Sequence, residues 1–565
     1  MGKRNKKQYD KFDESKSTTG KDVERGSNGK KPDARNSFNG KKSGKPMSMF
    51  SAYKQQNDPL YYMGVSELVE PAASIPTFQQ AGRAFALSPE STSPNDLTHT
   101  YLYKYTVPSI MQLKWIPSPG ISRDSTSGMS IAASMLYQFI RGKLNYLTSY
   151  APADLAVAMM CYDSLLIMYH EIVRIFGCVN YYSGYNLALP KALTMAAGLD
   201  EFGFKDLYQN LANYRLEFNQ LVAKMKTIYM PITTTFNEKH MWCAENVWTD
   251  SNTHKAQIYI YKVSGVYLWN EMTSDQGSMA EFMSLSDTTS MGGYLTIFDG
   301  MIEAMRNSDS LAKIMADLRK AYDNAEGWKP AYLDEDYCIE IGTNDTVCAQ
   351  IQNSTIYPFT YTDLNITQSV DKNIVLYDPT INLPNQAPYV NGDVREVITQ
   401  LALGKQLVNF PMDNPNSKDI VEFTRNIHTF ERFEPDSADA FPIRFAATST
   451  DYLTTANVFI VDADTVMTTG LHNMFYLING NTIANMNLTA FNVFSAFDWC
   501  PRVILINNAA AGKTTAVSGI AWDFNNFVLV PAENLAKLNE AITLSVWNVP
   551  ADGAPASSGR WGSVK

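Results

Sequence analysis

The spacing of apolar residues predicts helices in the first half of the chain. From residue 130, apolar side chains recur every three or four positions, as they do along one face of an α-helix. This set comprises Ile131, Met135, Leu136, Phe139 and Ile140. The same spacing predicts helices over residues 206–226 and 310–322, the second with Asp309 or Ser310 as its N-terminal cap. Residues 50–125 contain many prolines, so strands and loops are expected there.

The most apolar stretch, residues 155–176, is expected to be a buried helix rather than a membrane span. It carries titratable side chains that are costly inside a bilayer. These are Asp163, His170, Glu171 and Arg174. Pro152 suits the first turn of this helix, Asp154 complements its positive end, and Gly177 is predicted to end it.

After Tyr332 the pattern changes to short apolar runs separated by glycine, proline and asparagine, which is typical of strands. Asn391-Gly392 and Asn479-Gly480 are turn signals, and the second predicts a hairpin between the runs that flank it. Two later strands and a short helix are predicted at residues 503–506, 527–530 and 532–541.

These patterns predict an α+β protein in four parts. A chain of 565 residues is too long for one ordinary core, so more than one domain is expected. The predicted parts are a basic arm at 1–48, a helix-rich region at 49–330, a β-rich region at 331–490 and a β-rich C-terminal segment at 491–565.

The first 46 residues form a basic tail on an acidic protein. They hold 14 Lys/Arg and 6 Asp/Glu, a net of +8, whereas the whole chain carries −10, so the remaining residues carry −18. The tail has no Leu, Ile, Trp or Cys, and we expect it to be disordered because it cannot bury enough apolar surface. Such a tail can displace counterions from a phosphate backbone, which favours nucleic-acid binding over a purely solubilising role. Its densest basic clusters are Lys3, Arg4, Lys6, Lys7, Lys30, Lys31, Lys41 and Lys42.

The one motif that suggests nucleotide binding is incomplete. Gly512-Lys513-Thr514 resembles the end of a phosphate-binding loop, but Asn507 stands where that loop needs its first glycine. The residues that follow have the pattern of a strand, whereas a phosphate loop needs a helix N-terminus there. We therefore interpret this segment as a surface loop.

Metal and cysteine chemistry are not supported either. His170-Glu171 begins like a zinc-protease helix, but Arg174 stands where the second histidine is needed. The acidic runs at 334–336 and 462–464 are more typical of solvated loops than of cation sites. The six cysteines form no CxxC pair, which favours a reduced, intracellular setting. The chain is interpreted as non-enzymatic, with no metal, no cofactor and no small-molecule substrate.

Three stretches between residues 180 and 261 carry a resemblance to a known family through the order and spacing of their residues. These stretches include the motifs Leu189-Pro190-Lys191-Ala192-Leu193, Asn210-Leu211-Ala212-Asn213-Tyr214-Arg215, Lys239-His240-Met241-Trp242 and Trp248-Thr249-Asp250. In these stretches the chain resembles the capsid proteins of picobirnaviruses. The later, β-rich half resembles that family in general texture only.

The resemblance implies the sole shell subunit of a small icosahedral virus, assembled as homodimers on a T=1-type lattice around a double-stranded RNA genome. Residues 49–330 would form a mainly helical shell domain and 331–490 a β-rich projecting domain, with 491–565 either returning to the shell or joining the projection. The disordered basic N-terminal arm would contact RNA. The resemblance also implies a place in the virion, assembly in the host cell cytoplasm, and contact with a host membrane during entry.

Two other functions stay open from the residues alone. A non-viral RNA-binding scaffold protein would share the basic arm but would bind RNA as a stable monomer. A nucleic-acid-dependent NTPase would use Lys513 and would lose phosphate release when that lysine is replaced. Closed, uniform particles of the purified protein would favour the capsid interpretation over both.

Overall fold

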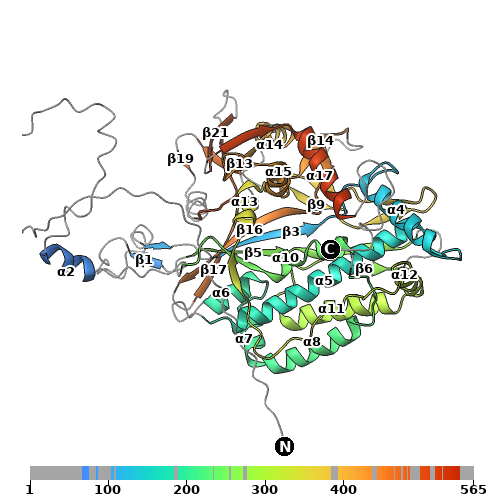
Figure 1. Cartoon of the computed structure of the whole chain (residues 1–565). Helices are drawn as coiled ribbons and strands as arrows, with labels where there is room; N and C mark the ends of the chain where they lie inside the picture. The colour runs from blue at the N-terminus through green and yellow to red at the C-terminus, as the bar shows by residue number, and fades with distance from the viewer. Residues whose placement is uncertain are drawn as a thin grey trace, which may run out of the picture. The chain divides into compact units, whose positions relative to one another are not determined.

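The chain divides into two units, Met1–Thr77 and Phe78–Lys565, in the computed structural model (Figure 1). In the first unit the structure describes one helix, α2 (Ser66–Ser74). The residues described are 66–74, 84–86, 104–106, 110–182, 189–232, 234–253, 256–271, 277–383, 392–434, 442–462, 465–471, 475–479, 482–483, 497–508, 516–522, 524 and 526–547.

A six-stranded mixed sheet brings together segments that are far apart in the sequence (Figure 1). Its order is β17-β16-β3-β5-β4-β8. The strand bounds are β3 (Ile110–Pro117), β4 (Val247–Thr249), β5 (Ile258–Val263), β8 (Ile341–Thr343), β16 (Asp451–Asp462) and β17 (Thr465–Leu471). Strand β3 pairs in parallel with β5 and antiparallel with β16. The predicted helix-rich and β-rich regions therefore share one sheet, and the assignment of residues 331–490 to a projection stays a prediction.

Helix α5 (Pro152–Asn180) is buried along nearly its whole length, as the sequence predicted. Its N-terminus is held as expected, with Pro152 in the first turn and the Ala151 amide donating to Asp154 Oδ2 at 2.9 Å. By length and composition α5 could cross a membrane, but 94% of its apolar window is buried inside the protein. Five further helices contact it: α4 (Gly128–Lys143), α6 (Leu189–Ala196), α9 (Thr235–Glu238), α10 (Met241–Glu245) and α11 (Met291–Arg306).

The structure corrects the predicted end of α5. Gly177 was predicted to stop this helix, but the helix continues through it to Asn180. A Cβ atom at Gly177 would lie 2.5 Å from Ile339 Cγ2, so this glycine permits close packing of another segment instead of ending the helix.

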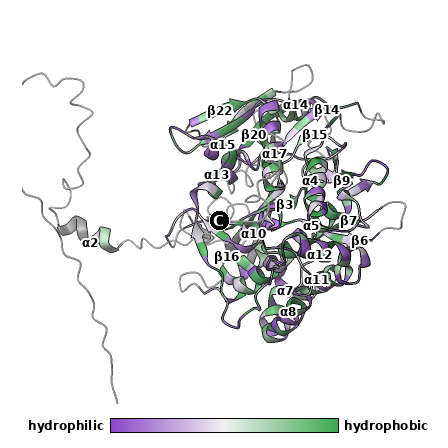
Figure 2. Cartoon of the chain, turned by 45° about the vertical axis from the view of Figure 1, so that its right-hand side comes forward, coloured by the Kyte–Doolittle hydropathy of each residue, from purple (hydrophilic) through white to green (hydrophobic). Residues whose placement is uncertain are grey.

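Two other helix predictions were right in kind and wrong in detail. The helix predicted over 206–226 is two helices, α7 (Glu201–Gln209) and α8 (Leu211–Met225), separated at Asn210. The last predicted helix of this region is α12 (Asp309–Ala321), and its cap is Ser308, whose side chain accepts from the Leu311 amide at 3.1 Å. The ribbons of α8 and α11 carry both hydrophobic and hydrophilic residues (Figure 2), and their buried residues are all apolar, as in partly buried helices.

The second half of the chain mixes short sheets with helices. Gly392, predicted to lie in a turn, begins helix α14 (Gly392–Leu403), and Asn391 lies outside the described residues. The other helices here are α13 (Asp345–Asn353), α15 (Ser417–Thr424) and α17 (Ala532–Val546), the last at the predicted position. Of these helices only α17 was predicted; α14 was missed although Val394, Val397, Ile398 and Leu401 have helical spacing, and α13 and α15 are only nine and eight residues long.

Several predicted strands and the hairpin are confirmed. Strands β18 (Phe475–Asn479) and β19 (Thr482–Ile483) pair antiparallel across Asn479-Gly480. They belong to a four-stranded sheet of order β19-β18-β20-β21, with β20 (Val503–Asn508) and β21 (Ala516–Ala521). The remaining pairs are β1 (Ala84–Ala86) with β2 (Lys104–Thr106), β6 (Gly265–Asn270) with β7 (Met279–Ser284), β9 (Thr360–Thr362) with β12 (Thr380–Asn382), β10 (Thr367–Ser369) with β11 (Ile374–Leu376), β13 (Gln406–Phe410) with β22 (Asn526–Val530), and β14 (Thr429–Arg432) with β15 (Ile443–Ala447).

One continuous hydrophobic cluster forms the main core of the second unit and includes buried residues from Ile110 to Trp547. A smaller cluster lies under β13, α15 and α17 and consists of Ala349, Val408, Phe410, Phe423, Ile427 and Leu535. The α+β fold predicted from the sequence is therefore present, with its core assembled from both halves of the chain.

Candidate functional site

The basic residues predicted to contact RNA lie outside the described residues. They are Lys3, Arg4, Lys6, Lys7, Lys30, Lys31, Lys41 and Lys42, and their role stays a prediction. Lys513 also lies outside them, but the strands on either side of it are described. Asn507 of β20 pairs with Ala516 of β21 in an antiparallel ladder, so a strand stands where a phosphate loop needs a helix.

The feature most suited to binding another protein is an exposed apolar edge strand, β22 (Figure 2). Three consecutive residues of β22, namely Phe527, Val528 and Leu529, are exposed, the last at 55%. Phe524, which precedes the strand, is exposed and its ring lies 5.5 Å from that of Phe527. We call Phe524, Phe527, Val528 and Leu529 the β22 patch.

Strand β13 pairs with one edge of β22, and β13 is itself mostly buried. Strand β22 pairs antiparallel with β13, for example Val528 with Val408, and Val408 is fully buried. Within the described residues β22 has no second strand partner. As far as the described residues go, the outer edge of β22 therefore leaves backbone N–H and C=O groups without a strand partner beside apolar side chains, a combination that favours pairing with another chain.

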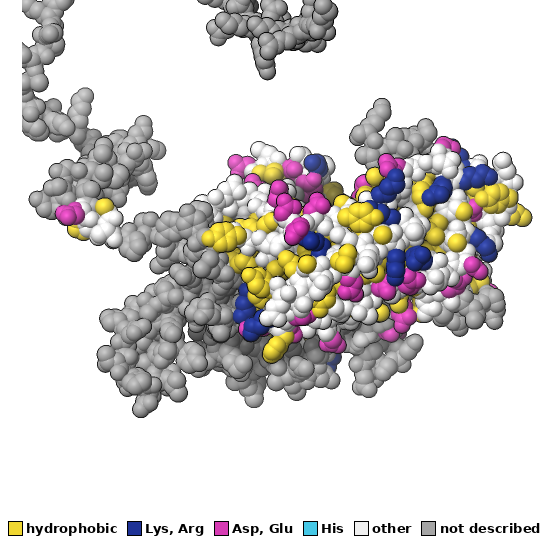
Figure 3. Space-filling model, turned by 90° about the horizontal axis from the view of Figure 1, so that it is seen from below, with side chains coloured by type: hydrophobic (Ala, Val, Ile, Leu, Met, Phe, Trp, Pro, Cys, Tyr) yellow, Lys and Arg dark blue, Asp and Glu magenta, His cyan; other side chains and the backbone are white. Residues whose placement is uncertain are grey.

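A second set of exposed apolar side chains lies on α7 and α8. Phe202, Tyr208 and Leu216 are each more than 60% exposed. Figure 3 looks at the molecule from below, the side on which α8 lies in Figure 1, and shows hydrophobic side chains interspersed with charged ones of both signs. Because single exposed apolar residues are common on protein surfaces, this face is weaker evidence for an interface than the continuous β22 patch.

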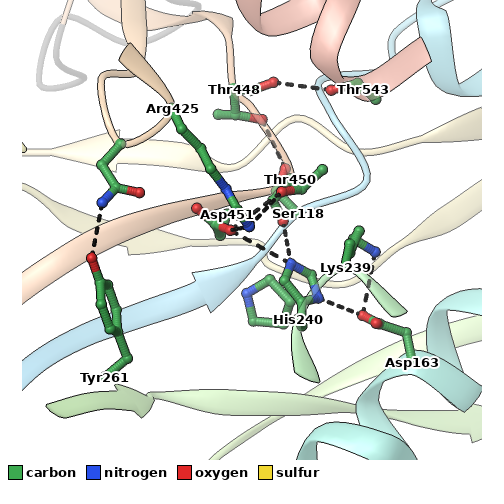
Figure 4. A network of polar contacts seen from close by, with 12 residues as sticks. Ser118, Asp163, Lys239, His240, Tyr261, Arg425, Thr448, Thr450, Asp451 and Thr543 are labelled. Atoms are coloured by element: carbon green, nitrogen blue, oxygen red, sulfur yellow. Dashed lines mark hydrogen bonds and ion pairs between the residues drawn. The ribbon is translucent and has the colours of Figure 1, made fainter. Parts of the chain in front are cut away.

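A buried polar network joins α5 to β16 and holds the sheet to the helices (Figure 4). His240 Nδ1 lies 2.8 Å from Asp163 Oδ2, and its Nε2 lies 2.9 Å from the Thr450 carbonyl oxygen. Lys239 Nζ lies 3.4 Å from Asp163 Oδ2, and Arg425 Nη2 donates to Asp451 Oδ2 at 2.7 Å. Two cations thus face two carboxylates, which offsets part of the cost of burying charge.

Burial and charge shift the pKa values of this network. Burial lowers the pKa of the Lys239 ammonium to about 8, although Asp163 opposes the shift. Burial also lowers the pKa of His240 against the opposing effect of the same carboxylate. Burial alone would raise the pKa of Asp163, but His240 and Lys239 together bring it below its usual value. The sequence did not reveal this network, because its members come from segments nearly 300 residues apart.

A second buried network explains the acidic and basic residues of the apolar α5 sequence. Glu171 Oε1 accepts from Arg174 Nη2 at 2.6 Å, and Glu171 Oε2 accepts from Lys262 Nζ of β5 at 2.9 Å. Arg174 Nη1 also donates to the Cys243 carbonyl oxygen at 2.7 Å. His170 is nearly fully buried beside the Tyr169 ring, and burial lowers its pKa to about 4. Glu171 therefore holds the helix to the sheet, in agreement with the interpretation of His170-Glu171 as core residues.

No group of three or more His, Cys, Asp or Glu side chains suited to a metal ion occurs within the described part of the chain. Asp336 and its acidic neighbours lie on an exposed segment, and Ala463 and Asp464 lie outside that part. The six cysteines form no disulfide, and burial raises the pKa of Cys161 and Cys178, which makes these two poor nucleophiles.

Comparison with known proteins decides the family. The family model described as "Picobirnavirus, Capsid protein" matches residues 61–442, about two thirds of the sequence. The chain belongs to the picobirnavirus capsid protein family. The matched region contains all three stretches in which the sequence resembles that family, and a capsid protein is a component of the virion.

Two individual proteins extend this result beyond the matched region. The capsid protein resembles the capsid protein precursor of Human picobirnavirus (strain Human/Thailand/Hy005102/-), with 22% identity over 522 residues, 88% of this chain and 92% of that relative. Its fold is similar to that in the X-ray crystallographic structure of the picobirnavirus capsid, with a TM-score of 0.73 and 20% identity. That match covers 89% of this chain and 100% of the solved chain.

The β22 patch of this capsid protein was only partly visible in its sequence. Residues 527–530 were predicted to be a strand, which is confirmed by β22. Three consecutive apolar residues without polar alternation are, however, equally typical of a strand buried on both faces. Only the tertiary structure shows that the apolar side chains of β22 are exposed.

Proposed function

We propose that this capsid protein assembles as homodimers into an icosahedral shell that encloses a double-stranded RNA genome. Membership of the capsid family supports self-assembly, and the exposed β22 patch is the observation that carries the proposal for this chain. An exposed apolar edge strand is a liability in a protein that stays monomeric, whereas in a homo-oligomer it can be covered by a second copy. The protein acts as a structural component without catalysis.

The β22 patch is the proposed contact between two copies. Antiparallel pairing of β22 with its counterpart around a two-fold axis would satisfy the outer backbone groups of both strands. Phe527 and Leu529 of each copy would then meet across the pair, because residues two apart in a strand share a face. Their burial would supply the hydrophobic part of the association free energy.

A substitution that places charge in the β22 patch tests this contact. Phe527→Asp should prevent dimers and particles, while Phe527→Leu, which keeps the apolar character, should retain them. Sedimentation velocity and electron microscopy of the purified full chain measure both outcomes. Because each 1.4 kcal/mol of lost contact lowers an association constant tenfold, the defect should be large. Particles of normal yield from Phe527→Asp, with unchanged thermal stability, would contradict the β22 contact.

The basic arm is proposed to contact the RNA. It is the one strongly basic segment of an otherwise acidic chain, with a net of +8 against −18 for the remainder. Lysine and arginine contacts to phosphates release counterions, so binding should weaken steeply with salt. The acidic remainder would repel RNA, which would leave the genome loosely held inside the shell.

Deletion of residues 1–46 should leave particle assembly intact and lower the RNA content of the particles. A charge-only control replaces the eight clustered Lys/Arg residues of the arm with Gln and keeps its length. Each lost phosphate contact should reduce the slope of log affinity against log salt by about 1. The ratio of absorbance at 260 and 280 nm measures the RNA content of the particles. An unchanged RNA content in both variants would contradict an RNA-binding role for the arm. Assembly in the host cytoplasm and a membrane contact during entry stay predictions.

A further inference from the structure

A polar pocket of about 480 Å³ opens beside the central sheet, where β3, β5 and β16 lie next to one another. Its walls carry two lysines and several hydroxyl groups, and it has no part in the proposed subunit contact or the arm. The residues that matter here are Lys114, Lys262, Ser264, Thr288, Thr454 and Thr455. We call it the Lys114 pocket.

The sheet register places the two lysines on the same face. Lys114 of β3 is the direct partner of Lys262 in the parallel β5, and Thr455 of β16 is the partner of Lys114 on the other side. Side chains at directly paired positions point to the same side of a sheet and lie close together. Two like charges in this arrangement destabilise the sheet unless an anion lies between them or beside them.

One lysine of the pair has an ion-pair partner inside the protein, whereas the described residues offer none to the other. Lys262 donates to the buried Glu171 at 2.9 Å, and its ammonium lies 4.8 Å from the centre of the Tyr294 ring. For Lys114, the described residues offer no carboxylate within 4.0 Å. Burial and the nearby charge of Lys262 accordingly lower the pKa of Lys114. An unpaired, half-buried cation is costly, and a bound anion would remove that cost.

Among the described residues that line the pocket, the single carboxylate is already occupied. Asp200 Oδ1 accepts from the Gly203 amide at 2.6 Å, and Asp200 Oδ2 accepts from Thr289 Oγ1 at 2.8 Å, so Asp200 caps helix α7. With Glu171 also paired to Arg174, the charged groups around the pocket leave an excess of positive charge.

The backbone beside Lys114 is irregular, and hydroxyl groups lie at this irregularity. The ladder between β16 and β3 shifts register between Leu453 and Thr455, which leaves Thr454 without a direct partner. Thr454 Oγ1 lies 3.3 Å from the Lys114 carbonyl oxygen and 3.4 Å from Ser264 Oγ. Such bulges often redirect side chains next to binding sites.

We propose that the Lys114 pocket binds a phosphate group, with Lys114 as its main cationic contact and Lys262 and nearby hydroxyls as further donors. A phosphate presents several acceptor oxygens, which suit ammonium and hydroxyl donors that point into one cavity. The volume lies within the range of small-ligand sites and exceeds what a free phosphate needs. The phosphate can therefore come from the medium, from a mononucleotide or from the backbone of an RNA strand.

Thermal stability of the full chain, purified free of nucleic acid in a chloride buffer, tests the proposal. A ligand that binds the folded state raises the Tm in proportion to the logarithm of its concentration above Kd. Inorganic phosphate should raise the Tm of the native protein above that in sodium chloride of equal ionic strength. In Lys114→Met, which keeps the apolar stem and removes the charge, the apparent affinity should fall at least tenfold. Lys372→Met, at an exposed lysine away from the pocket, should respond like the native protein.

Three parallel titrations, with inorganic phosphate, adenosine monophosphate and a short single-stranded RNA, distinguish the three possible sources of the phosphate. The tightest binding that depends on Lys114 identifies the ligand. Without any ligand, Lys114→Met should be as stable as the native protein or more stable, because it removes a like-charge pair. Three results would each overturn the site: no response to phosphate beyond sodium chloride, a response that Lys114→Met leaves unchanged, or a loss of stability in unliganded Lys114→Met. None of these depends on whether shells form.

Discussion

Strands β3 and β22 are both rich in large apolar residues, but their environments differ completely. β3, with the sequence IMQLKWIP, is buried at seven of its eight positions: β5 and β16 pair with its two edges, and α6 and β6 also contact it. β22, with the sequence NFVLV, has β13 on one edge and exposed side chains at its three central positions. The difference shows that two apolar strands of one chain can be buried or exposed, and a second copy is the proposed cover for β22.

The strongest test of this comparison is truncation of a large side chain in β3. Trp115 is almost fully buried, and its ring lies 4.9 Å from that of His240. Trp115→Ala should lower the free energy of unfolding by about 3–5 kcal/mol, because it removes apolar contacts and leaves a cavity. Urea unfolding of the unassembled subunit measures this change. A loss below 1 kcal/mol would show that the β3 region is not a packed core.

An effect of similar size is expected where charge is buried against the sheet. Glu171→Gln should cost about 3–5 kcal/mol, because it leaves the buried Arg174 and Lys262 without their common partner. Arg306→Gln, at an exposed i,i+3 pair with Glu303, is the matched control and should change stability by less than about 0.5 kcal/mol. Equal effects of the two variants in urea unfolding would contradict a distinction between covered and exposed regions.

A smaller effect is expected from buried histidines. His428 lies among the rings of Tyr357, Phe430 and Phe445, and burial lowers its pKa to about 3. An unfolded histidine has a pKa of about 6.5, so below that pH the unfolded chain takes up a proton that the folded chain does not. His428 should therefore reduce the free energy of unfolding by about 2 kcal/mol at pH 5.

Phenylalanine suits the aromatic environment of residue 428 and does not titrate. His428→Phe should therefore remove the part of the loss in unfolding free energy at low pH that comes from His428. Unfolding free energies at pH 7 and pH 5 should differ less in His428→Phe than in the native protein. His170, with a pKa lowered to about 4, should contribute in the same direction. An unchanged pH dependence in His428→Phe would show that His428 does not remain neutral in the folded state. The β22 patch contains no titratable side chain, so acid should act on the core first.

The smallest effect on the subunit itself is expected in β22. Leu529→Ala should change the free energy of unfolding of the unassembled subunit by less than about 0.5 kcal/mol, because Leu529 is 55% exposed. The same substitution should weaken assembly measurably in sedimentation. A stability loss comparable to that of Trp115→Ala would mean that β22 is covered within its own chain, and the comparison with β3 would fail.

The sequence alone determined the α+β character, the buried helix at α5 and the family. Period-3.6 runs, apolar composition and motif spacing are local properties, so they could be recognised without a structure. The strands at 503–506 and 527–530, the hairpin at Asn479-Gly480 and the helix after Pro531 were found for the same reason. Helix ends were less reliable, as Gly177 and Asn210 illustrate, since tertiary packing decides whether a helix continues.

Tertiary structure alone decided which apolar strands are covered and which polar groups meet. The networks around Asp163 and Glu171 join residues of distant segments, and the Lys114 pocket arises from a register between three strands that are not consecutive in sequence. Burial and electrostatic pairing depend on distances in space, and a linear pattern of residues does not encode which strand becomes the neighbour of which. For this reason β3 and β22 look alike in sequence and differ in the folded protein.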